Sequence, residues 1–246
     1  MTGSGSGMWQ AKTELWPKPD SQCALGDFPL RVYGAVGFLT AQGPTVCGGN
    51  MGGIGDGNEC YIFKEQQWKP WTKMGTPRED ASVIQINPKK ALIIGGYEYA
   101  NMPLKTTELI SSTGFEEGTS HLGPRHPPGS EFPVTINRHC SFPINATLAM
   151  VTGGFQGRYS RFSSTATWFV DLTTLTVTPG PTMKTARHSH GCSIFKHGTK
   201  SFGIVSGGYK YDEDRRDYGG ELDSTEMIDL DQESPTWTEG MQDNSK

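Results

Sequence analysis

A run of four apolar residues closed by two glycines, ALIIGG at residues 91–96, is the most informative stretch of this 246-residue chain. Short runs of this kind that end in glycine are typical of buried β-strands that enter a turn. Two adjacent glycines suit a place where backbones approach closely or where φ is positive. The stretch therefore predicts a buried strand followed by a tight connection.

The same pattern occurs four times along the chain, about 50 residues apart, which is the spacing of a repeat array. The glycine doublets stand at residues 48–49, 95–96, 153–154 and 207–208. Each doublet follows an apolar run, at residues 44–47, 91–94, 148–152 and 202–206. After a polar loop of variable length, each unit has a second apolar run, at residues 59–63, 106–110, 165–170 and 224–230. These runs predict two neighbouring strands in each of four units.

An aromatic or apolar outer strand follows in each unit, and a bend with an arginine precedes the next unit. The outer strands are predicted around Trp68 and Trp71, Phe115, Val177 and Trp237. The bends are predicted at Met74 with Arg78, at Arg138 with His139, and at Met183 with Arg187. The next inner strand is predicted just beyond each bend, so each unit has four strands in the order inner, glycine-ended, third and outer. Four such strands make one twisted antiparallel sheet, and a ring of such sheets is a β-propeller.

These features resemble the Kelch-repeat family. The resemblance rests on the four doublets, on the spacing from Cys60-Tyr61 to Trp68, and on the links from Met74 to Arg78 and across residues 183–190. It covers about residues 30–240, although the second and third units lack the outer tryptophan. The resemblance implies an all-β, Kelch-type β-propeller with four four-stranded antiparallel blades, at about residues 30–77, 78–130, 131–186 and 187–240.

The rest of the chain is predicted to be a flexible linker at residues 1–7 and an N-terminal segment at residues 8–29 with an extra outer strand. The blades are assigned to residues 30–246. Four blades are fewer than most Kelch-type rings hold, so we expect a fragment, an open arc or a ring completed by another chain, the alternative being a compact four-blade ring. An open arc exposes apolar faces and unpaired blade edges, which predicts self-association.

The chain has five cysteines, an odd number, so at least one of them has no disulfide partner within this chain. Cys47 and Cys60 fall on neighbouring antiparallel strands, which predicts a disulfide, the alternative being two buried thiols. Extracellular invertebrate Kelch proteins show a similar Cys-Gly-Gly…Cys-Tyr blade, so the resemblance favours the disulfide. Cys140 and Cys192 are interpreted as small buried core residues on inner strands of adjacent units, and Cys23 has no predicted partner.

The sequence also indicates a compartment. Asn145-Ala146-Thr147 is an N-glycosylation sequon in a predicted turn. Together with the cysteine pair it predicts a secreted glycoprotein, with a cytoplasmic location as the alternative. The net charge of −4 argues against nucleic acid as a partner. No run of about 18 apolar residues occurs, so no membrane-spanning helix is predicted.

The chemically active residues carry no recognisable catalytic or metal-binding pattern. His188 and His190 share one face of a predicted strand, but they coincide with the repeat link and are interpreted as structural. The acidic residues of 212–223 are interpreted as a solvated loop rather than a calcium site. Glu108 and Glu226 occupy matching positions, which indicates a repeated structural role. We therefore predict no catalytic residue, no metal and no cofactor.

The loops that follow the doublets hold most of the candidate binding residues. Tyrosine and arginine are enriched at binding hot spots, and loops on a rigid scaffold commonly carry recognition. The candidates are Tyr97, Tyr99, Arg158, Tyr159, Arg161, Tyr209, Tyr211, Arg215, Arg216 and Tyr218. They predict a non-enzymatic module that binds a protein or a glycan. The alternatives are an intracellular substrate adaptor and a propeller enzyme, either a copper-radical oxidase or a hydrolase.

Overall fold

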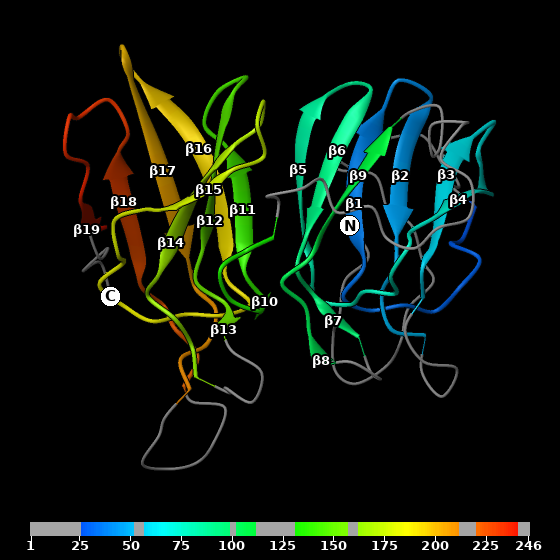
Figure 1. Ribbon diagram of the computed structural model, residues 1–246, viewed down its shortest axis with the longest axis horizontal. Coiled ribbons are helices and arrows are strands. Elements are labelled where there is room, and N and C mark those ends of the chain that lie inside the picture. Colours follow the sequence, from blue (N-terminus) through cyan, green and yellow to red (C-terminus); the bar gives the residue numbers. More distant parts are fainter. Residues whose placement is uncertain are drawn as a thin grey trace, which may run out of the picture.

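The computed structural model describes residues 26–51, 57–98, 102–111, 131–156, 162–211 and 220–240. Within these ranges the chain is all-β and the strands pair antiparallel (Figure 1), which confirms the prediction of an all-β chain with antiparallel sheets. None of these ranges holds a helix that could cross a membrane.

Four sheets account for most of the strands. The first sheet contains β1 (Val36–Thr40), β2 (Gly43–Cys47), β3 (Glu59–Lys64) and β4 (Gln67–Lys73). The second contains β5 (Ser82–Asn87), β6 (Lys90–Ile94) and β9 (Thr107–Ser111). The third contains β11 (Cys140–Pro143), β12 (Leu148–Thr152), β14 (Thr167–Asp171) and β15 (Val177–Pro179). The fourth contains β16 (Gly191–His197), β17 (Lys200–Ser206), β18 (Thr225–Asp229) and β19 (Trp237–Glu239).

The predicted strands correspond to the second, third and fourth strands of these sheets. The outer strand expected around Phe115 lies outside the described residues, and the described part of the second sheet has three strands. The extra strand expected in residues 8–29 also lies mostly outside them, but Phe28 packs edge-to-face on Tyr61 and Trp68 of the first sheet. Two short ribbons complete the fold: β7 (Tyr97–Glu98) pairs with β8 (Met102–Pro103), and β10 (Ile136–Asn137) with β13 (Phe155–Gln156).

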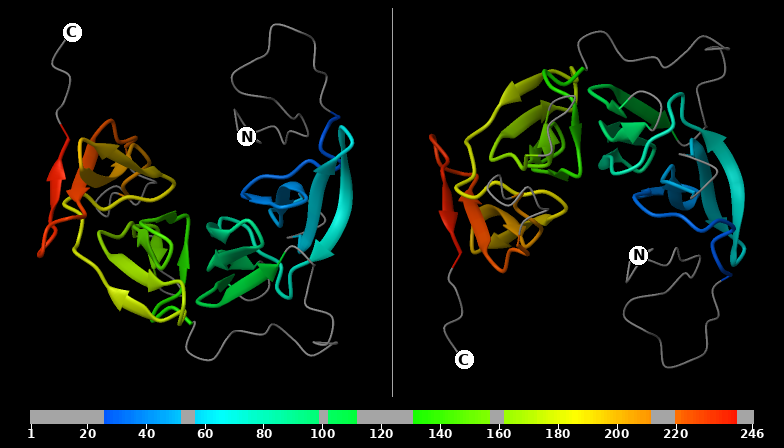
Figure 2. Two further views of the ribbon diagram at one scale, coloured as in Figure 1. Left: turned by 90° about the horizontal axis from the view of Figure 1, so that it is seen from above. Right: turned by 90° about the horizontal axis from the view of Figure 1, so that it is seen from below.

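The sheets follow one another along an open arc, with the first and the fourth sheets at its two ends (Figure 2). Neighbouring sheets meet through their first strands, since β1 contacts β5, β5 contacts β11, and β11 contacts β16. Each sheet thus has a forward face toward the next sheet and a backward face toward the preceding one.

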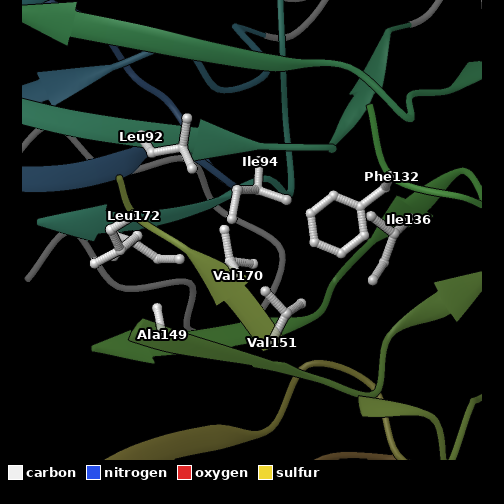
Figure 3. Packing of buried hydrophobic residues seen from close by; sticks show 9 residues of the cluster. Leu92, Ile94, Phe132, Ile136, Ala149, Val151, Val170 and Leu172 are labelled. Carbon is white, nitrogen blue, oxygen red and sulfur yellow. The ribbon is translucent and has the colours of Figure 1, made fainter. Parts of the chain in front are cut away.

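The hydrophobic core lies between the sheets, and strand alternation explains how one strand serves two interfaces. In β6, Leu92 and Ile94 point forward and pack on Ala149 and Val151 of the third sheet (Figure 3). Ile93 points backward and joins the cluster shared with the first sheet. A third cluster, between the third and fourth sheets, contains Phe142, Met150, Met183, Val205, Ile228 and Trp237.

In the first three units, the doublet connects its sheet to the link, the segment that leads from that sheet into the next one. The second glycine donates its N–H to a link carbonyl in three units: Gly49 to Arg78 (2.7 Å), Gly96 to Ile136 (2.8 Å) and Gly154 to Arg187 (2.8 Å). Gly95 shows why glycine is required, because its φ is 58° and a Cβ there would lie 2.3 Å from the Ile136 carbonyl oxygen. A side chain would therefore separate the sheets.

Two of the links carry a buried ion pair. The Arg78 guanidinium contacts the Glu108 carboxylate at 3.0 Å, and Arg187 contacts Glu226 at the same distance. Glu108 also accepts the backbone N–H groups of Gly75 and Thr76. Glu226 accepts those of Lys184 and Thr185 in the matching geometry. The matching glutamates therefore have the repeated structural role that the sequence indicates.

The link before the third sheet differs from the prediction. Ile136, not Arg138, accepts the glycine N–H and so occupies the position of Arg78 and Arg187. Trp168 stands opposite Ile136, in the position of Glu108 and Glu226, and packs edge-to-face on Phe132. Apolar side chains replace the ion pair here. The predicted link arginine, Arg138, therefore lies two residues after the equivalent position, which Ile136 occupies.

The described part of the chain contains two disulfides. Cys47 and Cys60 face each other across β2 and β3 and are joined, as the sequence suggests. Cys140 and Cys192 are also joined, which corrects their interpretation as separate core residues. They lie at the starts of β11 and β16, and the contact of these strands brings their Cα atoms to 5.9 Å. The residues around each cysteine could not predict this pairing, because it depends on how the third and fourth sheets pack against each other.

The disulfide between the third and fourth sheets is expected to stabilise the fold. It spans 52 residues, for which the chain-entropy account gives roughly 4 kcal/mol. We expect the variant Cys140→Ala/Cys192→Ala to lose about that much free energy of unfolding in urea, and Cys47→Ala/Cys60→Ala to lose somewhat less, since that bond spans only 13 residues. Free thiols at positions 140 and 192 in the oxidised native protein, seen by mass spectrometry, would contradict the assignment.

Candidate binding site

The links and the residues that follow the doublets lie together at one end of the sheets, where β7, β8, β10 and β13 are drawn in Figure 1. Each link pairs through its backbone with the residue just after a doublet. The pairs are Tyr33 with Asn50, Glu79 with Tyr97, Asn137 with Phe155, and His188 with Tyr209. Three successive units therefore place an aromatic residue in the same position. We call this end of the molecule the link face.

Stacked rings connect the third and fourth units on the link face. Phe155 stacks on His188 with ring centroids 4.1 Å apart, and His188 lies against Tyr209 at 5.8 Å with a similar tilt. The Arg138 guanidinium lies 5.8 Å from the Phe155 centroid, a cation–π distance. Phe155 and His188 are buried, whereas Tyr209 is 39% exposed. The stack is a buried support that ends in a solvent-accessible phenol ring.

Two further aromatic residues lie beside Tyr209. Phe162 is 49% exposed and packs edge-to-face with Tyr211 at 5.4 Å. Ser163 holds this group in place, because its hydroxyl accepts the Tyr211 N–H at 2.9 Å and lies 3.4 Å from the Tyr209 carbonyl. We call Phe162, Tyr209 and Tyr211 the aromatic patch. It comes from two loops of different units, fastened to each other by Ser163.

Polar groups continue from the patch toward the first unit. The Arg138 Nε donates to Asp80 at 2.8 Å, and both side chains remain partly exposed. Next to them, burial and then the Glu79 carboxylate raise the pKa of Tyr33 to about 12, so this phenol stays protonated and hydrogen-bonded to Glu79. The link face therefore offers aromatic surface at one end and a half-exposed ion pair in its middle.

Ser163 and His188 form a hydrogen bond of 2.8 Å between Oγ and Nδ1, the kind of contact that a nucleophile and its base make. Burial, together with the Arg138 charge, lowers the pKa of His188 to about 4, so its neutral ring is a weak base. No carboxylate among the described residues contacts His188, and the Ser163 oxygen already accepts an amide N–H. The pair is better suited to joining loops than to catalysis.

His139 and His190 are buried at matching positions of neighbouring links. His139 Nε2 lies 2.7 Å from Ser82 Oγ, and His190 Nε2 lies 2.8 Å from Thr152 Oγ1. His188 and His190 thus have separate partners, consistent with their structural interpretation. Within the described ranges, no three His, Cys, Asp or Glu residues are grouped as metal ligands.

Acid is expected to destabilise the fold through His139 and His190. Burial lowers the pKa of each to about 3, below the ordinary value of 6.5, so the unfolded chain binds more protons at mildly acidic pH. Their stabilisation is complete above pH 6.5 and falls as the pH drops toward 3, by about 2 kcal/mol for each histidine at pH 5.

Urea unfolding at pH 7.5 and pH 5 measures this effect. His139→Gln and His190→Gln should each flatten the pH dependence relative to the wild-type protein. Equal pH slopes for the wild type and both variants would contradict the expectation.

Three of the ten predicted binding residues lie in the described structure, and it brings two of them together. Tyr209 and Tyr211 belong to the aromatic patch, whereas Tyr97 is half-buried two units away and pairs with Glu79. The other seven lie outside the described residues: Tyr99, Arg158, Tyr159, Arg161, Arg215, Arg216 and Tyr218. Phe162, His188 and Arg138 were not predicted as site residues, although the repeat marks His188 and Arg138 as link positions.

The predicted sequon lies at the far end of the third sheet. Asn145 is exposed in the turn between β11 and β12, and its side-chain oxygen accepts N–H groups from Thr147 and Leu148. The doublet at 153–154 closes β12 at its other end, so a glycan on Asn145 would leave the link face uncovered.

No protein-family model matches this chain, and no curated protein matches it either.

Proposed function

We propose that this chain is a Kelch-type β-propeller arc that works as an extracellular binding module, with the link face as its binding surface and a protein or a glycan as its ligand. The arc of sheets with doublets in equivalent turns supports the Kelch assignment. The observation that carries the function is the aromatic patch, in which Phe162 and Tyr209 expose large rings on a rigid, buried support. Exposed aromatic rings on fixed loops give contact area at low entropic cost.

The ion pair extends this surface chemically. Asp80 and Arg138 hold each other in position while both remain partly exposed. Such groups can hydrogen-bond a carboxylate, a sulfate or a hydroxyl of a ligand that already covers the rings. A flat aromatic area next to fixed polar groups suits a protein epitope or the face of a sugar.

The disulfides support an extracellular location, because such bonds persist in oxidising compartments. They also make the two alternatives less favourable. A cytosolic adaptor would hold these cysteines reduced. A copper-radical oxidase would need a cysteine to cross-link to tyrosine, and the four cysteines of the described ranges are all in disulfides.

A paired substitution tests the aromatic patch. The wild-type protein is screened against a glycan array that includes sulfated and carboxylated sugars, and against a panel of purified extracellular domains. We expect Phe162→Ala/Tyr209→Ala to weaken any specific signal about 30-fold or more, since hot-spot truncations commonly cost about 2 kcal/mol or more.

Phe195→Ala is the matched control. Phe195 is also 39% exposed, but it lies near the β16–β17 turn at the opposite end of the fourth sheet. Binding should be unchanged in this variant. A signal that is lost equally in both proteins, or a screen without any ligand, would contradict the assignment of the site.

A further inference from the structure

Among the described residues, nothing covers the two end faces of the arc, which are the two halves of one repeated interface. On the backward face of the first sheet, Leu39 is 60% exposed and Val46 is half-buried. The residues equivalent to Val46 in the second and third sheets, Ile93 and Val151, are fully buried. On the forward face of the fourth sheet, Ile204 is half-buried, whereas Met150 in the matching position is fully buried. Leu39 on the first sheet and Phe195 on the fourth are exposed. The half-buried apolar residues of the two end faces are Val46, Tyr61 and Phe63 on the first sheet, and Phe202, Ile204 and Met227 on the fourth.

A ladder of backbone hydrogen bonds runs across all three internal interfaces. Asp80 donates its N–H to the Gly34 carbonyl, Arg138 to that of Asp80, and Ser189 to that of Arg138, at 2.8–2.9 Å. All four residues have φ between 52° and 66°, so each link presents its N–H backward and its carbonyl forward in the same geometry.

The ladder ends with an unused group on each side. In the described part of the chain, nothing accepts the Gly34 N–H at the backward end, and nothing donates to the Ser189 carbonyl at the forward end. The N–H of Gly208 is also without an acceptor there, although the second glycine of each earlier doublet donates to the next link. Polar groups and apolar residues thus continue the internal interface at both ends.

We propose that a second copy of this chain covers each end face, with the forward face of the fourth sheet of one copy against the backward face of the first sheet of another. This contact repeats the one that the chain makes three times internally, and it lets the Gly34 N–H of one copy reach the Ser189 carbonyl of its partner. Pairing of two like faces would instead oppose donor to donor or acceptor to acceptor. Copies therefore join head to tail, in a closed ring or an open chain according to the rotation.

Sedimentation of the purified protein over a range of concentrations tests the proposal. We expect the wild-type chain to associate, and Leu39→Lys or Phe195→Lys each to weaken association about 100-fold, because each would bury an unpaired charge. Both side chains are well exposed in the single chain, so folding is preserved. Phe162→Lys is the control: it changes an exposed residue on the link face and should associate like the wild type.

Mixing the two variants distinguishes head-to-tail contact from other arrangements. Leu39→Lys keeps its forward face and Phe195→Lys keeps its backward face, so an equimolar mixture should recover a one-to-one heterodimer. A wild-type chain that stays monomeric at every concentration, a variant pair that fails to recover association, or loss of association in only one variant would each overturn the proposal. Ligand binding is measured separately, and Phe162→Lys should abolish it without affecting association.

Discussion

The Arg187→Met variant should lose about 5 kcal/mol of its free energy of unfolding. The guanidinium of Arg187 and the carboxylate of Glu226 are both fully buried, so the substitution leaves an unpaired charge in the core. It also removes the donor that serves the Gly207 and Ser224 carbonyls, at 2.8 and 3.2 Å. Loss of one partner from a buried pair costs about 3–5 kcal/mol, and unsatisfied carbonyls add to it.

The third sheet shows how this position can be filled without charge. There Phe132, Ile136 and Trp168 stand where the fourth sheet has Met183, Arg187 and Glu226. We expect the triple variant Met183→Phe/Arg187→Ile/Glu226→Trp to recover most of the stability that Arg187→Met loses, because a well-packed apolar set can replace a buried ion pair.

Urea unfolding at neutral pH measures both variants. Lys200→Met provides the control, since its ion pair with Asp229 lies at the surface, where solvent screens it, and its loss should change the stability little. A triple variant no more stable than Arg187→Met would show that the two sets are not interchangeable, and a small effect of Arg187→Met would show that the buried pair does not stabilise the fold.

Gly95→Ala should cost a similar amount, about 5 kcal/mol, for a different reason. An L-residue at φ 58° pays about 1–2 kcal/mol for the left-handed conformation. Its Cβ would also lie 2.3 Å from the Ile136 carbonyl oxygen, which accepts the Gly96 N–H and cannot move without breaking that bond. The second and third sheets would have to separate at their link.

Gly198→Ala separates these two costs. Gly198 has nearly the same φ, 62°, but lies in the open turn between β16 and β17, where no atom is within 4 Å of the added Cβ. Thermal or urea unfolding should show only the conformational cost at this site. Equal losses at positions 95 and 198 would mean that close approach of the sheets is not the reason for the doublet.

Local patterns predicted most of the fold. The four doublets and the apolar runs beside them correspond to the strands that the structure contains, because alternation and turn chemistry act over a few neighbouring residues. The disulfide of Cys47 and Cys60 could also be predicted from local patterns, since both residues lie in one hairpin. Within the candidate site, Tyr209 and Tyr211 could be predicted because both lie in the loop that follows a doublet.

Contacts between sheets were not predictable in this way. Ile136 replaces the expected arginine because Trp168, 32 positions later, supplies an apolar partner instead of a carboxylate, and no local rule requires that exchange. Cys140 meets Cys192, and Ser163 meets His188, only because neighbouring sheets bring their first strands and links together. The sequence by itself determined where strands and turns form; tertiary structure alone decided which side chains face each other across the links, because such pairing depends on how whole sheets pack.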